Sequence, residues 1–165
     1  MRKPIFHFDK LKPFDLWTIG LYLLLTLGLY VNFKSTLNIT SQPKVIFFYA
    51  IGTQLFLYMF CYKSLRNLTT LFIWIAIGFL HLYFYFNFKD DITLQMLRGH
   101  ATTPLRNTIP LLVLQQVFRI VSIKIQNQEF VSPWRRSKDL FDGREGTLLD
   151  FILFFMYCGC VIVFD

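Results

Sequence analysis

Three nearly uncharged, aromatic-rich blocks, each about as long as a membrane-spanning helix, constrain this chain more than any other feature. They cover residues 16–33, 45–62 and 68–88. A helix rises about 1.5 Å per residue, so about 20 residues reach across a hydrocarbon core roughly 30 Å thick. The sequence therefore predicts an integral membrane protein.

The composition agrees with this prediction. Of the 165 residues, 55% are hydrophobic and only 16% are charged. A soluble domain of this size could not hide so much apolar surface. We expect one membrane domain over residues 1–165: an all-α bundle of four or five transmembrane helices with short loops and one amphipathic or re-entrant helix.

A further apolar segment, residues 148–164, is barely long enough to span. Thr147 followed by Asp150 predicts a capping box at its start. Asp15 and Asn67 are expected to cap the first and third helices.

Residues 108–126 are ambiguous. Four polar side chains follow one helical face of this segment, at i, i+4, i+7 and i+11: Gln115, Arg119, Ser122 and Gln126. A narrow polar stripe on an apolar helix fits three placements. The segment spans the membrane, re-enters beside a partner, or lies in the interface.

Small and hydroxyl-bearing residues in the first block predict contacts with other helices. We expect Gly20 and Gly28 to allow close approach of another backbone. The segment from Asp90 to Gly99 is expected to form one or two turns of surface helix. The hydroxyls recur every four positions in the first block, as Thr18, Tyr22, Thr26 and Tyr30.

The net charge of +7 indicates basic loops facing anionic lipid headgroups, and no module for binding nucleic acid is visible. Five spans with a cytoplasmic N-terminus place eleven of the 17 cations inside and five outside, leaving Arg119 in the membrane. Arg135 and Arg136 then lie in a cytoplasmic surface loop. We expect an uncleaved first span that acts as a signal anchor, and a bacterial inner membrane is consistent with the Phe, Ile, Lys and Asn bias.

Arg119 and the neighbouring Gln115 are the strongest functional candidates, because an ionisable residue at membrane depth is expensive. Arg119 could contact an anionic substrate, a lipid headgroup or an acidic residue of another subunit, or snorkel to the interface. Gln54 and His81 lie in apolar blocks and are expected to face protein. The acidic residues that could pair with Arg119 within the chain are Asp90, Asp91 and Asp150.

Asp139, Asp142 and Gly143 form an Asp-x-x-Asp-Gly stretch that resembles the opening of the aspartate motif of the CDP-alcohol phosphotransferases. In that family, clustered carboxylates hold divalent metals. The resemblance covers five residues, and Arg144 and Glu145 follow where the family continues with Ala-Arg. A solvated turn whose acids balance nearby cations is the alternative interpretation.

The three cysteines, Cys61, Cys158 and Cys160, are expected to be small buried hydrophobes, and we expect no metal or cofactor. The leading functional hypothesis is a non-catalytic subunit of a larger membrane assembly for translocation, secretion, transport or energy conversion. Its expected partners are the lipid bilayer and other integral membrane subunits. The alternatives are a small transporter or channel and a metal-dependent lipid-modifying enzyme.

Overall fold

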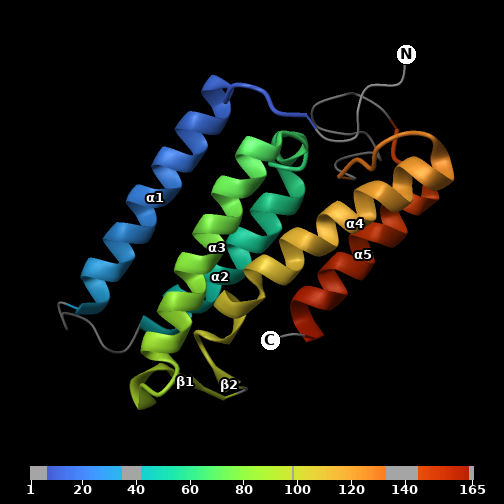
Figure 1. Ribbon diagram of the computed structural model, residues 1–165. Helices are drawn as coiled ribbons and strands as arrows, with labels where there is room; N and C mark the ends of the chain where they lie inside the picture. Colours follow the sequence, from blue (N-terminus) through green and yellow to red (C-terminus); the bar gives the residue numbers. More distant parts are fainter. Residues whose placement is uncertain (1–6, 35–41, 98, 133–144, 164–165) are drawn as a thin grey trace.

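The computed structural model in Figure 1 describes residues 7–34, 42–97, 99–132 and 145–163. The all-α prediction is confirmed. Five α-helices hold most of these residues: α1 (Pro13–Lys34), α2 (Gln42–Met59), α3 (Leu68–Phe88), α4 (Thr108–Gln126) and α5 (Leu148–Val163).

Most predicted helix limits agree with the structure. α3 and α4 have the predicted bounds, whereas α2 begins and ends three residues before the predicted 45–62. Pro43 falls in the first turn of α2, where its missing N–H breaks no helical hydrogen bond. Asn67 caps α3 as predicted, since its side chain accepts a hydrogen bond from the amide of Thr69 at 3.1 Å. Asp15 lies inside the first turn of α1 instead, where its carboxylate accepts from the amide of Lys12 at 3.2 Å.

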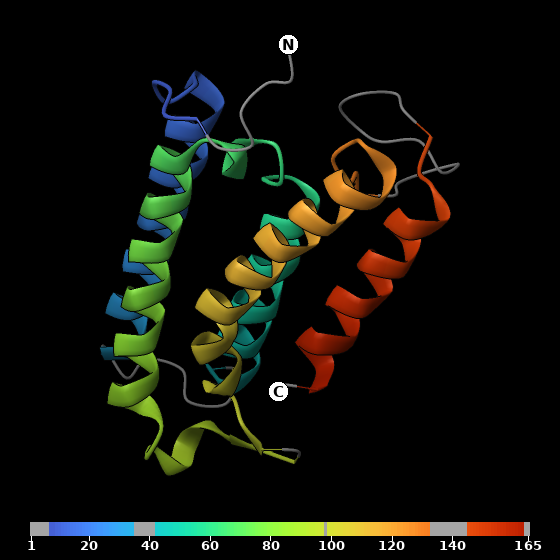
Figure 2. The ribbon, with the colours of Figure 1, turned by 45° about the vertical axis from the view of Figure 1, so that its right-hand side comes forward.

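The helices run back and forth between two ends of the bundle (Figures 1 and 2). α4 crosses from one end to the other, packed against α2, α3 and α5. It does not lie across an end. The N-terminal segment, the α2–α3 connection and the end of α4 meet at one end, which we call the N-terminal end, and the C-terminus lies towards the other.

Three aromatic-rich cores hold the helices together, and the third lies around Ala50 of α2 and Leu105. The first surrounds Trp74, where α1, α2 and α3 meet. The second lies between α2, α4 and α5, where the rings of Tyr58 and Tyr157 have centroids 4.3 Å apart.

The segment before α4 differs from the predicted surface helix. It forms a 3₁₀ turn, η2 (Ile92–Leu94), and a two-residue ladder of β1 (Gln95–Met96) with β2 (Gly99–His100). A buried 3₁₀ helix, η3 (Thr103–Asn107), then enters the bundle beside α2 and α3. Irregular backbone inside a helical bundle needs hydrogen-bond partners from the protein around it. The side chain of Gln54 supplies one, because it donates to the buried carbonyl oxygen of Pro104 at 2.7 Å.

Three segments of the described chain are long and apolar enough to cross a membrane, namely 13–33, 68–88 and 103–126. α5 is apolar but has only 16 residues. α1 is the peripheral helix, because 11% of its apolar window is buried, against 33% for α3 and 39% for 103–126.

The close approach of helices occurs at a different glycine from those predicted. A Cβ added at Gly20 or Gly28 would meet nothing within 4 Å, so no other part of the described chain packs closely there. At Gly78 of α3, a Cβ would lie 2.6 Å from Cγ1 of Ile109 on α4. The α3–α4 crossing therefore depends on glycine.

Candidate functional site

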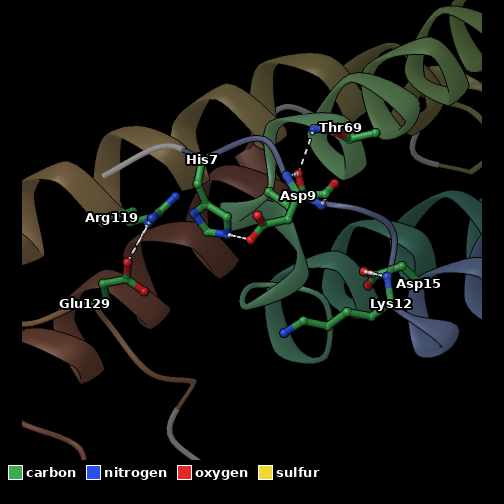
Figure 3. A network of polar contacts seen from close by, with 8 residues as sticks. His7, Asp9, Lys12, Asp15, Thr69, Arg119 and Glu129 are labelled. Carbon is green, nitrogen blue, oxygen red and sulfur yellow. Dashed lines mark hydrogen bonds and ion pairs between the residues drawn. The ribbon is translucent and has the colours of Figure 1, made fainter. Parts of the chain in front are cut away.

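A charged pocket of about 490 Å³ opens at the N-terminal end of the bundle (Figure 3). Its side chains come from the segment before α1, the α2–α3 connection, α4 and the segment after α4. This charged pocket is lined by His7, Asp9, Lys12, Lys63, Arg66, Arg119 and Glu129.

Glu129 joins two arginines in the pocket. The guanidinium of Arg119 donates to its Oε1 from Nε at 3.1 Å and from Nη2 at 2.9 Å. Arg66 forms an ion pair with the other carboxylate oxygen, Oε2. The side chain of Arg119 is only 4% exposed, whereas those of Arg66 and Glu129 are 28% and 25% exposed. A nearly buried arginine thus has an anionic partner within its own chain.

Glu129 is not among the acidic partners proposed from sequence, Asp90, Asp91 and Asp150. The chain reverses at Asn127, whose φ of 54° is in the left-handed region that asparagine tolerates well. Ser122 fixes the reversal by donating from its hydroxyl to the carbonyl of Gln128 at 2.9 Å. The asparagine at the helix end is the sequence signal that could have indicated this return.

Asn67 ties the segment before α1 to the pocket. Besides capping α3, its Oδ1 accepts from the amide of Asp9 at 3.2 Å, and its Nδ2 donates to the carbonyl of Asp9 at 2.9 Å. The amide of Leu68 donates to the carbonyl of His7 at 3.0 Å, and the His7 ring lies 3.3 Å from the Asp9 carboxylate. These contacts hold the start of the described chain against the first turn of α3.

The rest of the α4 polar stripe also bonds within the chain. Gln115 donates to the carbonyl of Leu57 at 3.2 Å. Gln126 donates to Asp150 at 3.1 Å, at the start of α5. The capping box is confirmed there, because Thr147 Oγ1 accepts from the amide of Asp150 while the Asp150 carboxylate accepts from the amide of Thr147.

A second polar cluster surrounds His81 between α1, α2, α3 and the start of α4. Nε2 of His81 lies 2.8 Å from the hydroxyl of Tyr22 and 3.0 Å from that of Tyr49, and Nδ1 lies 2.8 Å from Oγ1 of Thr108. Tyr22 also contacts Oγ1 of Thr53 at 2.8 Å. Two members of the predicted hydroxyl stripe, Tyr22 and Thr26, therefore face the bundle and join α1 to the other helices.

The threonine hydroxyls of this cluster are anchored to backbone carbonyls. Oγ1 of Thr108 donates to the carbonyl of Leu105 at 3.1 Å, Oγ1 of Thr53 to that of Tyr49 at 2.7 Å, and Oγ1 of Thr26 to that of Tyr22 at 2.8 Å. Both imidazole nitrogens of His81 therefore face hydroxyl groups that the helices hold in place.

A wide apolar groove of about 660 Å³ separates α1 from α2 on the outside of the bundle. Its lining includes the small Gly52 and the hydroxyl-bearing Thr18 and Thr53, of which Thr53 is buried and bonds within the chain. A Cβ at Gly52 would meet nothing within 4 Å, so the groove is open there. We call this feature the α1–α2 groove; its other lining residues are Phe14, Leu21, Tyr22, Leu25, Phe48, Tyr49, Phe56 and Phe60.

The structure distributes the predicted candidates over separate places. Arg119 lies in the charged pocket, His81 in the hydroxyl cluster, and Gln54 and Gln115 bond backbone carbonyls in the bundle interior. All four are buried, with 3% or less of each residue exposed. The four side chains bond to different partners among the described residues.

The remaining candidates have mixed outcomes. Arg135, Arg136, Asp139 and Asp142 lie outside the described residues, while Glu145 is exposed. The three cysteines are free thiols; Cys61 is buried as predicted, whereas Cys158 and Cys160 are only partly buried.

Comparison of the chain with models of known protein families, with curated proteins and with solved structures finds no match.

Proposed function

We propose that this chain is a multi-pass membrane protein that acts as a non-catalytic structural component of a larger membrane assembly. In this proposal the α1–α2 groove receives an apolar helix of another integral membrane subunit. The observation that carries the proposal is the groove itself, about 660 Å³ in volume and lined mostly by apolar side chains together with the small Gly52 and the hydroxyl-bearing Thr18.

The small and hydroxyl-bearing residues of the lining favour a protein helix over lipid chains. Acyl chains can cover phenylalanine and leucine, but they gain nothing from hydroxyls or from a glycine. Helix interfaces within membranes are enriched in small residues and in serine and threonine, which allow backbones to approach and hydrogen bonds to form. Gly52 and Thr18 supply such a surface, and α1 packs only one narrow face against its own bundle.

The test is to fill the groove without disturbing the fold. Gly52→Leu places a side chain where the chain leaves open space, so the thermal unfolding midpoint should stay within a few degrees of the unsubstituted protein. A photo-crosslinking residue at Phe48, which is 68% exposed in the groove, should join the chain to one discrete membrane protein in native membranes, and Gly52→Leu should abolish this product.

The controls separate the groove from the general apolar surface. Gly20→Leu adds the same side chain to α1 in open space outside the groove lining, and it should leave the product intact. A photo-crosslinking residue at Phe79, 61% exposed on α3, should give no discrete product. Crosslinks to lipid alone, to a second copy of this chain, or equally from both positions would contradict the proposal.

We also propose five spans with a cytoplasmic N-terminus in a bacterial inner membrane. The end-to-end path of all five helices supports this topology. The described cations add only a small bias, with five at the N-terminal end (Lys10, Lys12, Lys63, Arg66 and Lys124) against four at the other (Lys34, Lys44, Lys89 and Arg106). Single cysteines at positions 10 and 89, in a cysteine-free background, should react with a membrane-impermeant maleimide only from the cytoplasmic and only from the external side, respectively.

A further inference from the structure

We infer that the charged pocket binds a phosphate-type anion, supplied either by the headgroup of an acidic phospholipid or as free phosphate. The inference goes beyond the proposed docking function, because it concerns a different site at the N-terminal end. It begins from the lining charges, since four of the seven described residues that line the pocket are lysine or arginine and two are carboxylates.

Among the described lining residues, cationic groups outnumber carboxylates. Glu129 carries one negative charge, yet Arg119 bonds one of its oxygens and Arg66 pairs with the other. Lys12 and Lys63 add two more cations, against one further carboxylate from Asp9. Counted over the described lining residues, with histidine uncharged, the net charge is about +2, which a phosphate group would balance.

Three of the four cations have contacts that position their side chains before any ligand arrives. Arg119 is nearly buried, and the guanidinium of Arg66 lies 6.0 Å from the centre of the Tyr62 ring. The ammonium of Lys63 lies 5.9 Å from the centre of the same ring. The backbone just before Lys12 is fixed by Asn67 through Asp9. Such preorganisation lowers the entropic cost of binding.

The position of the pocket along the bundle fits a headgroup. Lys12 directly precedes α1, and Arg66 lies two residues before α3. α3 contains no lysine, arginine or carboxylate, and α1 has only Asp15 in its first turn and Lys34 at its end, so the pocket would lie where hydrocarbon gives way to headgroups. Its volume of about 490 Å³ is large enough for a phosphate and part of its ester.

The test keeps the arginine–glutamate contacts and removes the two lysine charges. In detergent micelles, sodium phosphate should raise the thermal unfolding midpoint relative to sodium chloride of equal ionic strength. If a headgroup is the source, nanodiscs containing phosphatidic acid should stabilise the protein relative to phosphatidylcholine alone. The double variant Lys12→Gln/Lys63→Gln should weaken the apparent affinity at least tenfold in the arm that responds.

Two matched variants control for a general loss of positive charge and for the loss of the lysine side chains themselves. Lys44→Gln/Lys89→Gln removes two exposed lysines from the other end and should leave affinity within twofold. Lys12→Arg/Lys63→Arg keeps the charge and should retain binding. If sodium phosphate raises the unfolding midpoint, the ligand is free phosphate. If only nanodiscs with phosphatidic acid raise it, the ligand is the lipid headgroup. No response in either arm, or equal weakening by both lysine-to-glutamine pairs, would overturn the inference and leave the docking proposal unaffected.

Discussion

Arg119 of α4 donates two hydrogen bonds to one carboxylate oxygen of Glu129, ten positions further along the chain. The pair gives the most expensive residue of an apolar helix a partner inside its own molecule. The polar stripe of α4 is therefore no reason in itself to invoke another subunit. The case for an assembly depends instead on α1 and the groove beside it.

Removal of Glu129 should be costly. Glu129→Ala leaves two guanidinium groups without their shared carboxylate, and Arg119 is too buried for water to replace it. We expect a loss of about 2–4 kcal/mol in the free energy of unfolding, below the value for fully buried pairs because Glu129 is a quarter exposed. Chemical unfolding in mild detergent with increasing dodecyl sulfate measures this loss.

Two comparisons test the cause. Glu145→Ala removes an exposed carboxylate and should change the free energy of unfolding by less than about 0.5 kcal/mol. Adding Arg119→Met to Glu129→Ala should recover part of the lost stability, because the buried charge is then gone. If Glu129→Ala is as stable as Glu145→Ala, the ion pair is not important for folding.

Gly78→Ala should loosen the α3–α4 crossing. The new Cβ would lie 2.6 Å from Cγ1 of Ile109, a β-branched side chain with little freedom to move. We expect a destabilisation of about 1–3 kcal/mol from overpacking. Gly20→Ala is the matched control, because its Cβ meets open space and alanine favours a helix by about 1 kcal/mol.

A rescue experiment makes this prediction specific. Ile109→Ala removes the atom that the new methyl group would strike, so it should suppress most of the additional loss caused by Gly78→Ala. Equal losses from Gly78→Ala in the presence and absence of Ile109→Ala would show that the two residues do not clash.

Local sequence signals predicted much of this fold. Residues 68–88 and 108–126 are helical with the predicted bounds, because the length of each apolar run and the polar residues on either side of it define where the helix begins and ends. The Asn67 cap and the Thr147–Asp150 box were also predictable, because they need only residues within one helical turn.

Contacts between distant segments were not predictable in the same way. Gly20 and Gly28 have the residue type that allows close approach, but Gly78 makes that approach, because packing decides which face meets a neighbour. The pairing of Glu129 with Arg119 was not predictable from spacing, because it depends on the left-handed turn at Asn127 that brings Glu129 back beside α4. The charged pocket combines four chain segments, and no single stretch of sequence contains it.

Asn67 should couple the start of the described chain to α3. Asn67→Ala removes the helix cap and both hydrogen bonds to Asp9, at a cost of about 1–2 kcal/mol. Asn67→Asp keeps the accepting oxygen but loses the donor to the Asp9 carbonyl. In Asn67→Ala, the hydrogen-exchange rates of the Asp9 and Thr69 amides should both rise. In Asn67→Asp, the exchange rate of the Thr69 amide should stay low. Identical exchange in the two variants would contradict this dual role.

The acid at the start of η2 should respond to pH. Hydrogen bonds from the hydroxyl and amide of Thr93, at 2.7 and 2.9 Å, lower the pKa of Asp91 below its ordinary value. Ionised Asp91 therefore stabilises the folded turn above that ordinary value of about 3.9, and the contribution disappears as pH falls through the lower folded pKa. Carboxyl NMR titration should report a higher pKa in Thr93→Val but not in Thr93→Ser. An unchanged pKa in Thr93→Val would exclude the hydroxyl as the main cause.

The attachment of α1 should depend on a few hydroxyls. Tyr22 contacts Thr53 and His81, and Thr26 lies 2.6 Å from the hydroxyl of Tyr49. Each such bond contributes about 0.5–1.5 kcal/mol, so Tyr22→Phe/Thr26→Val should weaken the attachment by about 1–3 kcal/mol while preserving shape. Spin labels on α1 and α3 should then report a broader distance distribution. Tyr83→Phe, an exposed tyrosine on α3, should leave that distribution narrow. A narrow distribution in the double variant would mean that apolar packing around Ile19, rather than the hydroxyl cluster, positions α1 beside the groove.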